Sequence, residues 1–145
     1  MNNLGFEEIL DESNTFHLVA TMYMLGNDLL VILSGIEDHI GSITLAQPYH
    51  APVNPNIKPN HTTPDTKERI SASISTLTQY HHRDDQLLSE FGRSLSQKLN
   101  MVVAVMGGIH VDNITKREIK ILFSLIAKLQ EKIIENVLTF QQKSK

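Results

Sequence analysis

The chain has 145 residues, of which 41% are hydrophobic and 20% are charged, and this size and composition predict a single globular domain over residues 1–145. The formal net charge of −3 argues against binding to the phosphates of nucleic acid or to an anionic membrane. The absence of cysteine excludes disulfides, thiolate metal ligands and a cysteine nucleophile, so any metal would be bound by nitrogen and oxygen atoms.

The N-terminal sequence contains Glu7 and Glu8 and lacks the basic start and apolar run of a signal peptide. No window of the sequence has the length and apolar character of a transmembrane helix. We therefore expect a cytoplasmic protein.

The first half of the sequence predicts strands. Apolar and β-branched residues recur in short runs at residues 16–25, 29–33, 40–47 and 70–78, with turn residues between them. Residues 26–28 read Gly-Asn-Asp, which predicts a hairpin between the first two runs. The second run is apolar almost without interruption, which is typical of a central strand that is covered on both faces.

All five prolines lie within residues 48–67. A stretch of this length without periodicity is too long for a simple connection in a compact domain. We predict a proline-rich loop insertion that serves as a lid or an arm for a partner, or that is disordered.

The second half of the sequence changes to a helical period. Residues 84–99 carry apolar side chains on one helical face, and acidic residues at their start suit the positive end of the helix dipole. Residues 101–106 predict an apolar strand that ends at a Gly-Gly pair. A long helix is predicted from Thr115, because Thr115 and Glu118 form a capping box. The apolar stripe of this helix consists of Ile119, Leu122, Ile126, Leu129, Ile133, Val137 and Phe140.

The predicted elements follow the order ββββαβα. A strand–helix–strand unit requires parallel strands and a right-handed crossover, whereas the earlier strands are joined closely enough to be antiparallel. We therefore predict an α/β (α+β) domain with a mixed, mostly antiparallel five-stranded sheet and two helices packed mainly on one face.

Strand direction brings three loops to one edge of this sheet. If the strand at residues 29–33 runs up and the following strands alternate, the loops after this strand, after residues 70–78 and after residues 101–106 all lie at the top. Both helices also begin there. Ligands of α/β sheets bind at such edges, next to the ends of parallel strands and the N-termini of helices.

These three loops contain histidines and carboxylates. His39, His82 and His110, with Asp85 or Asp112, would supply ligands for zinc, iron, nickel or manganese. The alternative is that these histidines lie at the surface or have structural hydrogen bonds. We assign no function to His17, His50 and His61.

The pair Gly107-Gly108 has two interpretations. Its amides approach an anionic ligand at the start of a helix, or the pair forms a tight turn that needs positive φ. The spacing of a dinucleotide fingerprint or a P-loop is absent. Ser71, Ser73 and Ser75 are expected to face solvent, with a polar pocket or a dimer surface as alternatives. The sequence contains no nucleophile elbow, which argues against a hydrolase.

Three segments of the sequence, taken together, resemble a known family. They are residues 34–48, SGIEDHIGSITLAQP, residues 71–85, SASISTLTQYHHRDD, and residues 104–114, AVMGGIHVDNI. In this order they resemble the prenylated-flavin chaperone family typified by LpdD, the small D subunit associated with gallate-type decarboxylases. The resemblance covers roughly residues 15–138.

The resemblance implies a fold similar to that of proteasome-assembly-chaperone-like domains. It implies a non-catalytic accessory protein that binds prenylated FMN or FMN, together with a divalent or trivalent metal ion. Such a protein assists the maturation of the cofactor or its delivery to the large subunit of a UbiD-type aromatic-acid decarboxylase. It is expected to be a homodimer.

The resemblance also suggests site residues. We expect the cofactor to be bound by Gly41, Ser42, Arg83, Gly107, Gly108 and Asn113. We expect the metal to be bound by His39, His82, Asp85, His110 and Asp112.

Two other functions remain open on this sequence. In the first, the chain is an assembly or interaction subunit of a decarboxylase complex without cofactor chemistry, and it docks a larger partner through the sheet, the final helix and the proline-rich loop. In the second, it is a small metal-dependent enzyme.

Overall fold

The computed structural model describes residues 1–13, 15–35, 37–51, 69–80, 85–109, 111 and 113–143. The described residues form one six-stranded sheet and two helices, in the order βββββαβα. The elements are β1 (Asn2–Leu10), β2 (His17–Leu25), β3 (Asp28–Gly35), β4 (Ser42–Ala51), β5 (Arg69–Thr78), α1 (Asp85–Leu99), β6 (Val103–Ile109) and α2 (Lys116–Lys143). The predicted fold class is confirmed, since the sheet is mixed and mostly antiparallel.

Strand β1 is the element that the sequence did not predict. It pairs antiparallel with β2, and its register shifts between Asn3 and Gly5. The shift hides the alternation of the strand, because it inserts an extra residue into the period of two. Glu7 also obscures the pattern of a half-buried strand, because this charged residue faces α2 and accepts a hydrogen bond from Asn136 Nδ2 at 2.7 Å.

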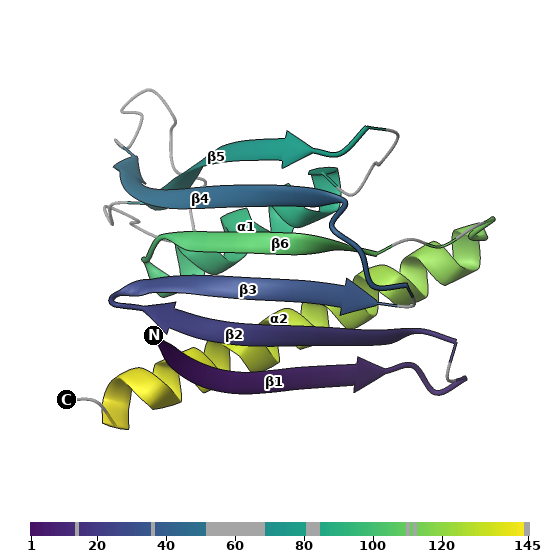
Figure 1. Ribbon diagram of the computed structural model, residues 1–145, viewed down its shortest axis with the longest axis horizontal. Coiled ribbons are helices and arrows are strands. Elements are labelled where there is room, and N and C mark those ends of the chain that lie inside the picture. Colours follow the sequence, from purple (N-terminus) through teal and green to yellow (C-terminus); the bar gives the residue numbers. More distant parts are fainter. Residues whose placement is uncertain are drawn as a thin grey trace, which may run out of the picture.

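The strand order across the sheet is β1-β2-β3-β6-β4-β5 (Figure 1). Strand β6 lies between β3, to which it is parallel, and β4, to which it is antiparallel. The crossover from β5 through α1 to β6 therefore passes over β4. As predicted, β5 and β6 point in the same direction, but they are not neighbours.

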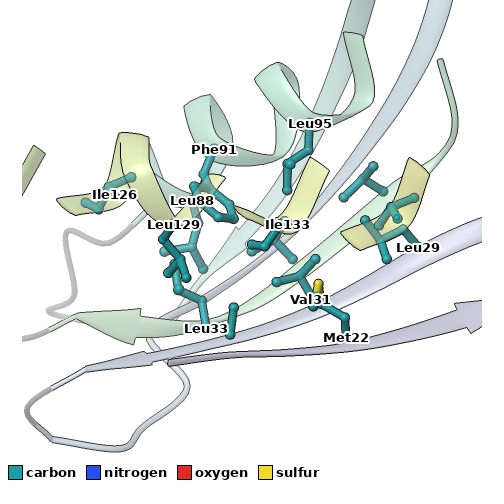
Figure 2. Close-up of a cluster of buried hydrophobic side chains, with 14 of the residues drawn as sticks. Met22, Leu29, Val31, Leu33, Leu88, Phe91, Leu95, Ile126, Leu129 and Ile133 are labelled. Carbon is teal, nitrogen blue, oxygen red and sulfur yellow. The ribbon is translucent and has the colours of Figure 1, made fainter. Parts of the chain in front are cut away.

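Both helices pack on the same face of the sheet. Helix α1 contacts β4, β5 and β6, and α2 contacts β1 and β2. Figure 1 views the sheet from its other face, with both helices behind it. Figure 2 shows side chains of the strands, among them Met22 and Val31, meeting Leu129 and Ile133 of α2 in the core. All four of these side chains are fully buried.

The stripe predicted for α2 is largely confirmed. Leu125, which was not part of the prediction, is buried together with Ile126, Leu129, Ile133 and Val137. Ile119 is 36% exposed, so its assignment to the buried stripe was wrong. It lies in the first turn of α2, before the part of the helix that packs on the sheet. Neither helix of the described chain has an apolar stretch that could cross a bilayer.

Strand β3 is central, as predicted, but its coverage differs from the prediction. Leu29, Val31 and Leu33 are buried beneath the helices, whereas Ile32 on the opposite face is 38% exposed. The helices thus cover one face of an element whose sequence is apolar on both faces.

Strand β4 continues into the segment that was predicted as a proline-rich loop. Pro48 pairs with Ala72 of β5, beyond the last β4–β6 pair at Ala46 and Val103. Proline is tolerated there because the pairing of β4 with β6 has already ended, and no other described strand accepts a hydrogen bond on that side. Residues 52–68 lie outside the described residues.

Candidate functional site

The strand directions bring three connections to one edge of the sheet, as the sequence predicted. Strands β3, β5 and β6 end there, at Gly35, Thr78 and Ile109, while β4 begins there at Ser42. Figure 1 shows this edge on the right, where α1 and α2 also begin. We call the edge formed by these strand ends the convergent edge.

His39 lies directly against Gly108 of β6. A Cβ atom added to Gly108 would lie 2.4 Å from Nε2 of His39 and 2.7 Å from its Cε1. A side chain at residue 108 would therefore occupy the space of the imidazole. The contact joins the loop after β3 to β6, two segments that are 69 residues apart in the sequence (108 − 39 = 69).

The other ring nitrogen of His39 is held by the backbone. Nδ1 lies 3.0 Å from the carbonyl oxygen of Glu37. When Nδ1 carries the proton and donates it to this oxygen, Nε2 is the acceptor nitrogen of the neutral ring. This is the arrangement in which a histidine binds a metal ion or accepts a hydrogen bond from a ligand.

Gly41 connects the loop after β3 to both neighbouring segments. Its amide donates a hydrogen bond to the carbonyl oxygen of Gly107 at 2.9 Å, and its own carbonyl accepts one from the amide of Gln79 at 2.8 Å. Backbone hydrogen bonds thus tie together β6, the start of β4 and the connection that follows β5. These hydrogen bonds hold the three segments of the convergent edge together without a contribution from side chains.

Ser42 is buried at the start of β4, with 1% of its surface exposed, and its Oγ has no hydrogen-bond partner. A buried hydroxyl without a partner costs about 1–3 kcal/mol. Deeper under α1, the hydroxyl of Thr76 is hydrogen-bonded to those of Thr44 and Ser89, at 3.0 Å and 2.8 Å. Among the described residues of this region, Ser42 thus has a buried hydroxyl whose hydrogen bond would come from a water molecule or a ligand.

The glycine pair lies inside β6, so the predicted turn and the predicted helix start are both wrong, while contact of its amides with an anionic ligand stays a prediction. Gly107 pairs with Leu33 of β3 and with Ser42 of β4, so it forms neither a turn nor the start of a helix. Its φ is +137°, and a Cβ there would lie 1.8 Å from the carbonyl oxygen of Leu33. Gly107 is required by the close approach of two strands, whereas Gly108 makes room for His39.

Two further predicted residues are described. Asp85 is the first residue of α1 and is partly buried. Asn113 has a left-handed conformation, with φ at +54°, shortly before α2. The capping box of α2 is confirmed, because the amide of Thr115 donates to Glu118 Oε2 at 2.8 Å and the amide of Glu118 donates to Thr115 Oγ1 at 3.3 Å.

The remaining predicted site residues lie outside the described residues, namely His82, Arg83, His110 and Asp112. Within the described part of the chain, no three histidine, aspartate or glutamate side chains are grouped as metal ligands. The convergence of these four residues with His39 and Asp85 stays a prediction.

Sequence reasoning missed a groove at the convergent edge, between β4 and β5. It has a volume of about 360 Å³ and is lined by Ile40, Gly41, Ser42, Ile43, Leu77, Thr78 and Gln79. Leu77 is 75% exposed and Ile40 is 52% exposed. The signal in the sequence is Leu77, a large apolar residue in the same alternating row of β5 as Ser71, Ser73 and Ser75.

A second pocket, of about 470 Å³, lies between the β1–β2 connection and α2. Its lining includes Asp11, Arg117, Lys120 and Lys128. A hydrogen bond from the amide of Phe16, at 2.7 Å, and others from Ser13 hold the pKa of Asp11 below its usual value. This pocket could not be predicted, because β1 was not predicted.

Comparison with known proteins agrees with the resemblance found in the motifs. Residues 12–138 match the family model of the prenylated flavin chaperone LpdD-like domain. No curated protein matches the chain. The matched region spans all the elements from β2 to α1 and β6 and most of α2. The chain therefore belongs to the LpdD-like family of prenylated-flavin chaperones.

Proposed function

We propose that this chain binds prenylated FMN at the convergent edge and assists its maturation or its delivery to the large subunit of a UbiD-type aromatic-acid decarboxylase. The observation that carries the proposal is the packing of the His39 imidazole on Gly108. It positions a histidine at the edge where the family motifs meet. Membership of a prenylated-flavin chaperone family supports the choice of cofactor.

The described residues of this edge fit a ligand that is part polar and part apolar. Ser42 Oγ is a buried hydroxyl without a partner on the face that α1 covers, and the His39 imidazole lies over Gly108 on the opposite face. Ile40 and Leu77 offer exposed apolar surface in the groove between β4 and β5. A prenylated flavin combines a planar ring, an added apolar group and a phosphate, so it calls for both kinds of contact. When bound to the decarboxylase, prenylated FMN supplies the cofactor chemistry of the reaction.

The proposal includes a metal ion held by His39 with His82, Asp85, His110 and Asp112. The orientation of the His39 ring supports it, because Nδ1 faces the carbonyl oxygen of Glu37, as the non-ligating nitrogen of a metal-bound histidine commonly does. Imidazole and carboxylate ligands suit a divalent or trivalent transition metal. A cation at this edge would also place positive charge next to the anionic cofactor.

Titration with the cofactor tests the proposal directly. Purified chain is titrated with reduced and with oxidised prenylated FMN, and binding is followed by the absorbance and fluorescence of the flavin. We expect His39→Ala to weaken binding at least about 10-fold, as loss of a metal ligand or of its orienting groups does elsewhere. His50→Ala is the matched control, since His50 lies near the other end of β4. Equal binding by both variants and the original chain would remove His39 from the site.

Metal analysis tests the ligand set separately. Replacing His82 or His110 with alanine should abolish metal retention and change stability by less than about 0.5 kcal/mol, if the two residues occupy loops as the sequence predicts. Metal content is measured by mass spectrometry and stability by denaturant unfolding. Unfolding of either variant with unchanged metal content per folded molecule would favour a structural role for these histidines.

Delivery and assembly complete the proposal. The chain acts as a homodimer and transfers its cofactor to the large decarboxylase subunit. Incubation of the loaded chain with cofactor-free decarboxylase should restore decarboxylation faster than free cofactor does at equal concentration. Equal rates would reduce the protein to a binding partner without a delivery role.

A further inference from the structure

The face of the sheet opposite the helices carries two rows of uncharged side chains. Paired residues on neighbouring strands point to the same face, so the register identifies each row. The first row crosses all six strands and consists of Phe6, Thr21, Ile32, Met106, Ile43 and Leu77. The second row consists of Asn3, Tyr23, Leu30, Ala104, Leu45 and Ser75. We call these twelve residues the open-face rows.

None of the open-face rows is buried in the single chain, since seven of the twelve residues are exposed and five are partly exposed. Phe6 is 64% exposed, Ile43 and Leu45 are each 41% exposed, and Ile32 on the central strand is 38% exposed. A continuous apolar surface of this kind is uncommon on a monomer and marks an interaction site. The apolar sequence of β3 also indicates an interaction site on this face. Strands of such composition are usually covered on both faces, and the two helices cover only one face of β3.

We infer that a second copy of this chain covers the open-face rows, so that two sheets pack face to face in a homodimer. This inference rests on the homodimer included in the proposed function, and it names the surface that forms it. A two-fold axis sets a surface against itself, so charges of one sign in its centre would repel each other. The open-face rows contain no charged residue, in a chain whose net charge is −3.

The size of this face also fits a second copy. Strands spaced ~4.8 Å apart and ~8 residues long, at ~3.3 Å per residue, give a six-stranded sheet a face of ~760 Å². A stable interface between two proteins of this size takes ~800 Å² from each partner. The face therefore provides nearly the whole area that a homodimer requires, without a contribution from the helices.

The candidate site borders this surface. Ser34 and Gly108 form the next paired row towards the convergent edge, on the same face as Ile32 and Met106. His39 lies over Gly108 and thus next to the area that the second copy covers. Dimerisation and ligand binding then occur side by side on one face.

A charge in the middle of the face tests the inference. In the dimer, Leu45→Glu places two carboxylates in an apolar interface, one from each copy. We expect the dissociation constant of the dimer to rise about 100-fold or more, as for a centrally placed interface residue. The mass in solution, measured by sedimentation equilibrium over a range of concentrations, should fall from twice 16.3 kDa to 16.3 kDa. Ile32→Glu on the central strand should have the same effect.

The matched control is Leu138→Glu on α2. Leu138 is 43% exposed, close to the 41% of Leu45, but it lies on a helix behind the sheet. This variant should remain a dimer, and circular dichroism should show that all three variants are folded. A monomeric original chain, or a dimer that survives both Leu45→Glu and Ile32→Glu in folded form, would overturn the inference.

Cofactor binding is measured on the same samples, which separates the two proposals. An original chain that binds prenylated FMN as a monomer overturns the dimer surface and keeps the proposed cofactor. A chain that dimerises through the open-face rows and binds neither oxidised nor reduced prenylated FMN supports the surface and overturns the cofactor.

Discussion

Gly107→Ala and Gly108→Ala should have different consequences, although the two glycines are adjacent in β6: the first should lower stability and the second should lower ligand affinity. In Gly107→Ala the new Cβ would lie 1.8 Å from the carbonyl oxygen and 2.8 Å from the carbonyl carbon of Leu33, and the φ of +137° disfavours any side chain. The strained backbone costs ~1–3 kcal/mol, and forcing apart two central strands costs ~1–3 kcal/mol more. The sum is a large part of the ~5–15 kcal/mol that stabilises a domain.

In Gly108→Ala the new methyl group meets the imidazole of His39, the end of a side chain on a partly exposed loop. The ring has to move by roughly 1 Å to restore ordinary contact, and it can do so by rotation. We expect a stability change within about 1 kcal/mol, because alanine also removes conformational freedom from the unfolded chain. Ligand affinity should nevertheless fall at least about 10-fold, since the ring no longer has its position.

Two measurements separate these outcomes. Urea unfolding followed by circular dichroism gives the stability of each variant, and the nitrogen-15 resonances of His39 report the environment of its ring. If Gly107→Ala is as stable as the original chain within about 0.5 kcal/mol, the close approach of β6 to β3 is wrong. If the His39 resonances of Gly108→Ala are unchanged, the contact between residues 39 and 108 does not exist in solution.

Three further changes test the fold. Leu129→Ala removes a fully buried side chain of α2 and should lower the free energy of urea unfolding by about 2–5 kcal/mol. Phe123→Ala, at a residue that is 59% exposed, should change it by less than about 0.5 kcal/mol. Equal effects of the two substitutions would contradict the packing of α2. Thr115→Ala removes the N-cap of α2 and should cost about 1 kcal/mol in the same assay, and no loss would mean that the cap is replaced by solvent. Asp11→Asn tests a pH effect, because the hydrogen bond from the Phe16 amide lowers the pKa of Asp11 in the folded chain. The Asp11 carboxylate therefore contributes stability above its unfolded pKa, near 3.8. This contribution is lost as the pH falls through the lower folded pKa. The variant should flatten the dependence of unfolding on pH in that acidic range, and an unchanged profile would exclude this role.

Elements with an undisturbed period were predictable from the sequence. Strand β2 alternates between buried and less buried residues along its whole length, and α1 presents Leu88, Phe91, Leu95 and Leu99 on one face. Their ends differ from the predicted ranges by a residue or less. The capping box of α2 was equally clear, because its two partners are close in sequence and need no knowledge of the fold.

Features that depend on distant partners were not predictable. The bulge after Asn3 and the inward-facing Glu7 make sense only next to β2 and Asn136 of α2. The glycine pair appeared to end a strand, because the local sequence does not show that Leu33 comes close to residue 107. The position of β6 between β3 and β4 is likewise set by tertiary packing.

The candidate site shows the same division. Strand direction alone was sufficient to predict that the loop with His39 meets the end of β6, and the structure brings His39 against Gly108. The buried hydroxyl of Ser42 on one face of the sheet and the exposed Leu77 on the other could not be predicted, since both follow from the register of β4 with β5.

The central position of β6 has a consequence for synthesis of the chain. Strands β3 and β4 follow each other closely in sequence, but β6 lies between them in the sheet. During synthesis, the edge of each strand that pairs with β6 therefore has no partner until residues 103–109 have emerged from the ribosome. A nascent or truncated chain that stops earlier carries two separate antiparallel units with bare inner edges, which is the form of polypeptide most prone to pair with its neighbours. Premature termination before β6 should therefore yield aggregates rather than a smaller folded protein.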